Sequence, residues 1–138
     1  MLVKQTNTLV IGASISGLAS SASLQKQGID YIIIERQNQA APAWRNHYDR
    51  LHLHTSKRFS NLPYKRFGRN IPRYPSRQQV VDYLDDYRKE FNINPVFNTE
   101  ALSVKKEADY WTTETTIGSF NSKHLIMATG AYGKPRPV

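Results

Sequence analysis

Apolar segments and glycines alternate along the first 35 residues in an order that predicts strand, turn, helix and strand. Residues 8–12 form a short apolar run that ends in glycine, as expected for a buried parallel strand that enters a tight turn. Apolar and small residues then recur at helical spacing from Leu18 to Leu24, and Gly28 supplies a stop signal. Residues 31–35 read as the second strand, with four large residues before an acid. This order predicts the right-handed crossover unit of doubly wound α/β proteins.

Three further kinds of segment follow this unit. Residues 37–75 show no periodicity, contain four prolines and are rich in aromatic and basic side chains, which favours a functional segment over a simple connection. Ser76 begins a Ser-x-x-Gln capping box, and one apolar face predicts a helix at about 77–90. The last third predicts three strands, separated by turn residues, that form a small antiparallel meander leading back to a buried strand; they span 101–106, 110–116 and 123–128.

The composition narrows the class of protein. A chain of 138 residues with 39% hydrophobic and 22% charged residues indicates one soluble globular domain. The chain has no cysteine, which excludes disulfides, thiolate metal sites and cysteine nucleophiles and agrees with the cytoplasmic location that we expect. Serines and glycines interrupt the N-terminal apolar run, so we reject a signal peptide. No stretch approaches the roughly 18 apolar residues of a membrane span, and we expect no membrane partner.

A net charge of +8 favours anionic partners. A nucleic-acid surface, attraction of a phosphate-bearing cofactor and a solvated basic face all agree with this charge. The solvated face is the preferred interpretation, because no helix-turn-helix, zinc-finger or RNP-type signature is present to organise contacts with bases.

The segment after the first strand carries the clearest chemical signal. Residues 12–17, Gly-Ala-Ser-Ile-Ser-Gly, match the dinucleotide-binding G-x-G-x-x-G pattern with Ser14 in place of the second glycine. Gly12 permits the tight turn, Gly17 lets the helix approach the strand, and the helix N-terminus offers N–H groups to a pyrophosphate. We expect the serine to cost between nothing and one hydrogen bond, about 0.5–1.5 kcal/mol. The alternative is a glycine turn that only closes a strand–helix corner.

Glu35 ends the second strand 18 positions after Gly17. This spacing is close to that which places a carboxylate against the hydroxyls of an adenosine ribose. A carboxylate there would repel a 2'-phosphate, which favours FAD or NAD over NADP. Arg36 is a candidate for contact with adenine or phosphate, although exposed basic residues at strand ends are equally common.

Taken together, these motifs resemble those of a known family, the class B flavoprotein monooxygenases, which include flavin-containing monooxygenases and plant auxin-forming enzymes. The resemblance covers nearly the whole chain. It rests on the runs 10–19, 34–36, 43–45, 48–54, 74–78, 83–84 and 128–130, and on Lys57. It implies an α/β, Rossmann-like FAD/NAD(P)-binding fold, with a parallel sheet, a crossover helix and a small antiparallel β-meander.

The resemblance also implies a set of FAD-binding residues. They are Gly12, Ala13, Ser14, Ile15, Ser16 and Gly17 at the pyrophosphate, Glu35 and Arg36 at the adenosine, Ala101 and Leu102 near the adenine, Trp44, Arg45, Leu53 and His54 along the flavin and its ribityl chain, and Ala128, Thr129 and Gly130 beside the cofactor. His54 is also the candidate catalytic residue, since relatives place an Asn or His near the flavin ring.

For two of these residues an alternative without a cofactor contact stays open. His54 is then a solvated loop histidine, and Trp44 a residue of the hydrophobic core. His47, His52 and His54 lie close in sequence, but their spacing matches no established metal motif, so we expect no metal site.

In the family, the chain continues into an NADPH-binding domain and later returns to complete the FAD domain. Neither the second glycine motif nor the returning segment occurs in this sequence, and residues 134–138 read as the start of a linker. We therefore expect residues 1–138 to be a single, incomplete FAD-binding domain without an NADPH site, inactive alone. The parent activity would be an NADPH-dependent monooxygenation of a small nucleophilic or carbonyl substrate. The alternatives are a non-catalytic nucleotide-binding remnant and, less favoured, a basic nucleic-acid-binding domain.

Overall fold

A computed structural model describes residues 2–130 of the chain, so the predicted linker at 134–138 lies outside the described residues. The elements in chain order are β1 (Val3–Ile11), α1 (Ile15–Lys26), β2 (Tyr31–Ile34), α2 (Pro42–Arg45), the 3-10 turn η1 (Lys57–Phe59), α3 (Arg77–Glu90), β3 (Ala101–Lys106), β4 (Trp111–Thr115) and β5 (Gly118–Met127).

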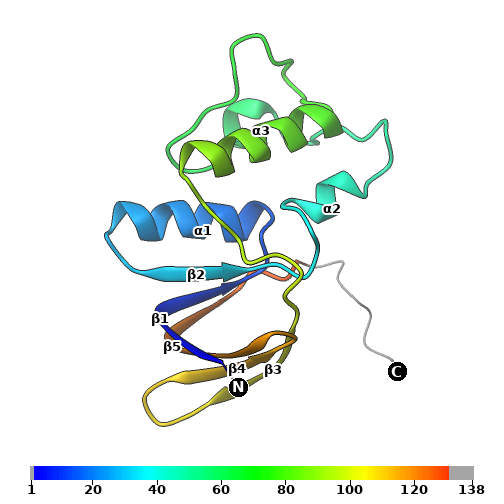
Figure 1. Cartoon of the computed structure of the whole chain (residues 1–138). Helices are drawn as coiled ribbons and strands as arrows, with labels where there is room; N and C mark the ends of the chain where they lie inside the picture. The colour runs from blue at the N-terminus through cyan, green and yellow to red at the C-terminus, as the bar shows by residue number, and fades with distance from the viewer. Residues whose placement is uncertain (1, 131–138) are drawn as a thin grey trace.

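The strands form one sheet in the order β2-β1-β5-β4-β3 (Figure 1). β1 is parallel to both β2 and β5, whereas β4 is antiparallel to β3 and β5. β5 therefore belongs to the parallel part and to the meander at once. The predicted architecture, a Rossmann-like parallel sheet with a crossover helix and an antiparallel meander, is confirmed.

Successive residues of the strands supply two hydrophobic clusters. Val10 and Ile33 belong to the larger cluster, which includes buried side chains of α1 and α3. Leu9 and Ile34 belong to a smaller cluster with Phe120. Because successive side chains of a strand point to opposite faces, both faces of the parallel part are covered. This explains the nearly continuous apolar run that announced β1 in the sequence.

Two strands are longer than the sequence predicted. β1 begins at Val3 rather than at residue 8, and β5 begins at Gly118 rather than at residue 123. The added halves pair with each other, with Val3 opposite Ser119. Both halves are largely polar, with Val3 and Phe120 as single large apolar residues, so neither shows an apolar alternation. The turn before β5 therefore lies at residues 116–117, because pairing with β1 and β4 overrides the low strand propensity of Gly and Ser.

The predicted stop of α1 at Gly28 is confirmed. Gly28 has a φ of 68°, its N–H donates to Gln25 O at 3.0 Å, and Ile29 N donates to Leu24 O at 3.0 Å. These two bonds form a Schellman motif, which satisfies the last carbonyls of the helix. The reversal delivers the chain directly into β2.

The capping box of α3 is also confirmed, and the helix has the predicted bounds. Gln79 N donates to the Ser76 hydroxyl, and the Gln79 side chain accepts from Ser76 N. We expect Ser76→Ala to lower the free energy of unfolding by about 1 kcal/mol, because a partly buried end of the helix loses one acceptor. Urea denaturation would measure this change. Ser60→Ala is the comparison, since its hydroxyl bonds only within the neighbouring loop.

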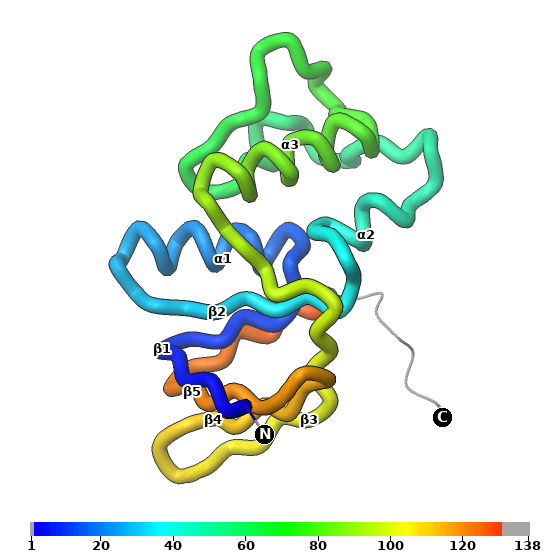
Figure 2. The backbone as a smooth tube through the Cα atoms, in the orientation of Figure 1, coloured from blue at the N-terminus to red at the C-terminus, as the bar shows by residue number. Residues whose placement is uncertain are grey.

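Side chains of α3 hold the irregular segment between α2 and α3, part of which rises beyond α3 in Figure 2. The Tyr83 hydroxyl donates to Lys65 O and accepts from Leu62 N, both at 2.8 Å. The Tyr87 hydroxyl donates to Pro63 O at 2.9 Å. Burial raises the pKa of both phenols, so they remain neutral donors through the physiological range. The segment is thus folded against α3, with the 3-10 turn η1 as its regular element.

Candidate functional site

The carboxyl ends of β1, β2 and β5 meet at one edge of the sheet. Gly12 N donates to Ile34 O at 2.9 Å, and Ala128 N donates to Ile11 O at 2.8 Å. Three predicted site positions, Gly12, Glu35 and Ala128, are thereby brought together from distant parts of the sequence. In open α/β sheets this edge is where ligands bind.

Two glycines allow the close packing of this edge. Gly12 has a φ of 104°, and a Cβ atom there would lie 2.3 Å from Ala128 O. A Cβ atom on Gly17 would lie 1.8 Å from Gly12 O. No side chain fits at either position. The glycine turn (residues 12–17) therefore depends on both residues being glycine, as the pattern predicts.

α1 begins at the glycine turn with free backbone donors. Ser14 is its N-cap in an extended conformation, but the Ser14 hydroxyl makes no capping hydrogen bond, and the first turn of α1 contains no acid. The first N–H groups of a helix have no intrahelical partner and carry a partial positive charge. Ser14, which stands in place of the second glycine of the pattern, leaves these N–H groups open, so the N-terminus of α1 fits a phosphate oxygen.

Glu35 braces the glycine turn from the end of β2. Its side chain is only 5% exposed. One carboxylate oxygen accepts from Ala13 N and the other from Gln37 N, both at 2.9 Å. A carboxylate has about four acceptor positions, so further hydroxyl donors can still bind it. The neighbouring Arg36 is exposed.

A segment that the sequence analysis missed runs beside Glu35. Glu35 N donates to Val96 O at 3.0 Å, and Thr99 N donates to Glu35 O at 2.9 Å. Residues 96–99 thus lie beside the carboxyl end of β2 and lead into β3. Ala101 begins β3 and is partly buried, while Leu102 is 63% exposed at a register shift. The structure therefore brings the start of β3 to the Glu35 end of the edge.

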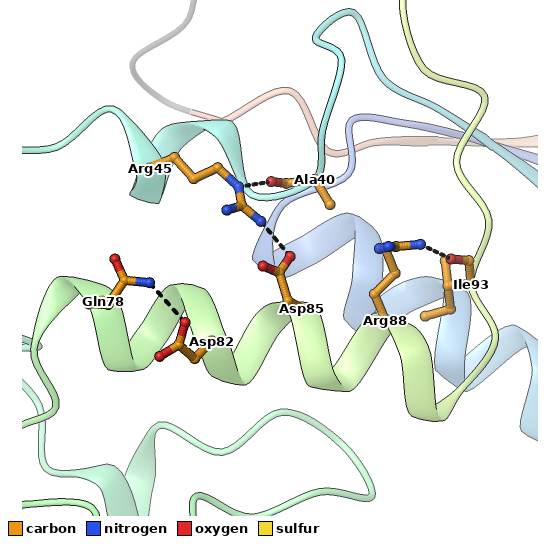
Figure 3. Close-up of polar contacts among 7 residues, drawn as sticks. All are labelled: Ala40, Arg45, Gln78, Asp82, Asp85, Arg88 and Ile93. Atoms are coloured by element: carbon orange, nitrogen blue, oxygen red, sulfur yellow. Dashed lines mark hydrogen bonds and ion pairs between the residues drawn. The ribbon is translucent and has the colours of Figure 1, made fainter.

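The segment around α2 contacts the glycine turn from its other side. Ala41 N donates to Ala13 O at 2.8 Å. Arg45 donates through Nε to Ala40 O at 2.8 Å and forms an ion pair with Asp85 of α3 (Figure 3). Trp44 is partly buried and packs against the larger core cluster. The predicted roles of Trp44 and Arg45 along a flavin stay predictions.

The remaining predicted residues lie on neighbouring loops. Leu53 N donates to Pro75 O at 2.8 Å, and its side chain packs partly buried against the larger cluster. His54 follows as an exposed residue, and its tentative catalytic role stays a prediction. Thr129 and Gly130 are exposed after β5. Ile15 and Ser16 lie in the first turn of α1.

Residues 2–130 present neither a cluster of metal ligands nor a membrane-spanning helix. No group of three or more His, Cys, Asp or Glu side chains in this range is arranged to hold a metal ion. Within the same range, no helix combines the length and apolarity that a membrane span requires.

Fold and site together have the features of the Rossmann-type dinucleotide-binding fold: a glycine turn after a parallel strand, an open helix N-terminus and a buried acid after the next strand. The chain belongs to the pyridine nucleotide-disulphide oxidoreductase family, whose profile matches residues 9–138.

Curated relatives are monooxygenases and an oxidoreductase. Over 130 residues the chain is 38% identical to the probable indole-3-pyruvate monooxygenase YUCCA4 of Arabidopsis thaliana, which covers 92% of this chain and 32% of the relative. It is 36% identical over 129 residues to an uncharacterized CzcO-like oxidoreductase of Geobacillus kaustophilus, covering 94% of this chain and 37% of the relative. The chain thus spans about a third of the length of these relatives. The predicted resemblance to flavoprotein monooxygenases is confirmed.

Solved structures share the fold. A flavin-containing monooxygenase from Stenotrophomonas maltophilia superposes with a TM-score of 0.87 at 23% identity, covering 98% of this chain and 41% of that one. The bacillithiol disulfide reductase Bdr (YpdA) from Staphylococcus aureus has a TM-score of 0.84 at 24% identity, covering 92% and 39%.

Proposed function

We propose that this chain binds FAD and is the FAD-binding portion of an NADPH-dependent flavoprotein monooxygenase. The observation that carries the proposal is the buried Glu35 carboxylate, which is hydrogen-bonded to Ala13 N of the glycine turn. This bond fixes an acid beside the open N-terminus of α1, the arrangement that a ribose followed by a pyrophosphate requires. The monooxygenase names of the relatives support the reaction class.

The residues divide the binding work along the dinucleotide. The N–H groups at the start of α1 would hold the pyrophosphate, and Glu35 would accept hydrogen bonds from the adenosine ribose. Bound FAD supplies the redox chemistry that side chains lack. The protein's part is to orient this group at the carboxyl edge of the sheet. The names of the plant relatives, indole-3-pyruvate monooxygenases, favour a small carbonyl compound as the substrate of the parent enzyme.

A visible absorption spectrum tests the binding directly. The purified chain is mixed with FAD and passed through a gel-filtration column. We expect a flavin band to remain with the protein. FMN is the matched control, because it carries the same flavin without the adenosine and the pyrophosphate bridge, and we expect it to be lost. Failure of the folded chain to retain FAD, or equal retention of FMN, would contradict the proposed site.

A second candidate is a nucleotide-binding module without catalysis of its own. One observation favours it: Gly12, Ala13 and Glu35 are brought together as a binding arrangement, whereas His54, the candidate catalytic residue, lies exposed on a loop. NADPH oxidation by the FAD-loaded chain distinguishes the two candidates. A rate above that of free FAD at the same concentration supports an enzyme, and a rate equal to it supports the module.

A further inference from the structure

We propose that Asp85 and Arg45 are positioning residues: their ion pair holds residues 40–45 against the glycine turn and thereby sets the affinity for the flavin half of FAD. The part that concerns FAD rests on the proposed function. The claim that the ion pair holds residues 40–45 against the glycine turn involves the protein alone and can be tested without a ligand.

Residues 40–45 contact the glycine turn through backbone hydrogen bonding. Ala13 is held on both sides, because its N–H donates to Glu35 and its carbonyl accepts from Ala41 N at 2.8 Å. Glu35 marks the adenosine end of the proposed site. Figure 1 shows α2 beyond the N-terminal end of α1, past the carboxyl ends of the strands. A ligand that continues from the pyrophosphate past this edge therefore meets residues 40–45.

Ala41 lies in the left-handed region of backbone conformation, with φ 56° and ψ 41°, and its side chain is fully buried. A non-glycine residue in this region costs free energy and persists where surrounding contacts fix it. The conformation of the segment thus depends on contacts from elsewhere in the fold.

α3 supplies these contacts, and they reach the segment through Arg45. Its Nε donates to Ala40 O, its Nη2 pairs with Asp85, and its backbone N–H donates to Ala41 O at 3.1 Å (Figure 3). Arg77 Nη1 also donates to Arg45 O at 2.9 Å, which ties the same residue to the start of α3. One guanidinium thus joins the residue before Ala41 to the middle of α3.

Partial burial strengthens the electrostatic attraction between Arg45 and Asp85. The side chains of Arg45 and Asp85 are 22% and 29% exposed, so solvent screens their attraction less than that of a fully exposed pair. Two of the guanidinium nitrogens are bonded within the protein, one to the segment and one to α3, which is what a positioning role requires.

Asp85→Asn tests the proposal, with Asp82→Asn as the matched control. Asp82 lies three residues earlier on α3, is exposed, and accepts only from Gln78 Nε2 at 2.8 Å (Figure 3). We expect Asp85→Asn to weaken FAD binding about tenfold and ADP binding less than about twofold, because ADP ends at the pyrophosphate. Asp82→Asn should change neither affinity. Isothermal titration would measure all of them.

A ligand-free measurement keeps the test independent of FAD. The chain has two tryptophans, so Trp111→Phe leaves Trp44 as the reporter within the segment. In this background Asp85→Asn should move the Trp44 emission maximum to longer wavelength, since the segment loosens and Trp44 becomes more exposed. Asp82→Asn should leave it unchanged. If Asp85→Asn fails to fold by circular dichroism, Arg45→Lys, which keeps the charge and loses the Nε bond to Ala40 O, replaces it with the same expected directions.

The outcomes separate the two proposals. An unchanged Trp44 spectrum, unchanged FAD affinity, or equal losses of FAD and ADP affinity would overturn the positioning role. A wild-type chain that binds neither ligand would contradict the proposed function, and the Trp44 spectrum would still decide the role of the pair.

Discussion

Replacing Gly17 with valine is expected to abolish FAD binding by this chain. Even the first added atom has no room, because a Cβ at position 17 would lie 1.8 Å from the Gly12 carbonyl oxygen. That oxygen belongs to the backbone of the residue that follows β1, so it cannot rotate away as a side-chain atom would. α1 must therefore move outward, which carries its N–H groups away from the pyrophosphate and opens the core at Leu18.

Titration with FAD, followed by flavin fluorescence, measures the loss. Gly28→Ala is the matched control, since a Cβ there meets no atom within 4 Å. Its φ of 68° makes that change cost about 1 kcal/mol of stability, but it lies at the far end of α1, so the affinity should stay at the wild-type value. A Gly17→Val protein with wild-type affinity would show that the glycine turn does not hold the pyrophosphate.

The sequence predicted the elements whose signals are local. The strand and turn before α1, the stop at Gly28 and the capping box of α3 each depend on residues within a few positions of one another. Such signals do not depend on the rest of the fold, because the backbone groups that these residues satisfy belong to the same helix end or turn. Glu35 was singled out by its spacing after the glycine turn, and its carboxylate accepts from Ala13 N of that turn.

What the sequence could not show depends on contacts between distant residues. Asp85 meets Arg45 across 40 positions, and nothing near Asp85 distinguishes it from the exposed Asp82. The left-handed conformation of Ala41 is likewise imposed by its surroundings, because alanine does not favour it. The largely polar halves of β1 and β5 form strands because they pair with each other and, in β5, also with β4. These features follow from tertiary structure rather than from local propensity.

The second large effect is expected for Glu35→Gln. Both oxygens of this buried carboxylate accept from backbone N–H groups, of Ala13 and of Gln37. A glutamine side chain offers one oxygen and one NH2 group, so one of the two N–H groups would face a donor. We expect the free energy of unfolding to fall by about 1–3 kcal/mol, the cost of a buried unsatisfied donor. We expect FAD affinity to fall about 10- to 100-fold, because the ribose loses a charged acceptor and the glycine turn loses its brace.

Comparison of two nucleotides separates these two roles of Glu35. The wild-type carboxylate should bind ADP-ribose more tightly than its 2'-phosphorylated form, because a phosphate at that position would lie against the negative charge. Glu35→Gln should narrow this preference, whereas Glu90→Gln, at an exposed ion pair with Lys65, should leave both affinities and the stability nearly unchanged. If Glu35→Gln loses stability but keeps the wild-type preference, the carboxylate only braces the turn. The adenosine ribose must then bind elsewhere along the edge, where residues 96–99 and the start of β3 are the nearest backbone.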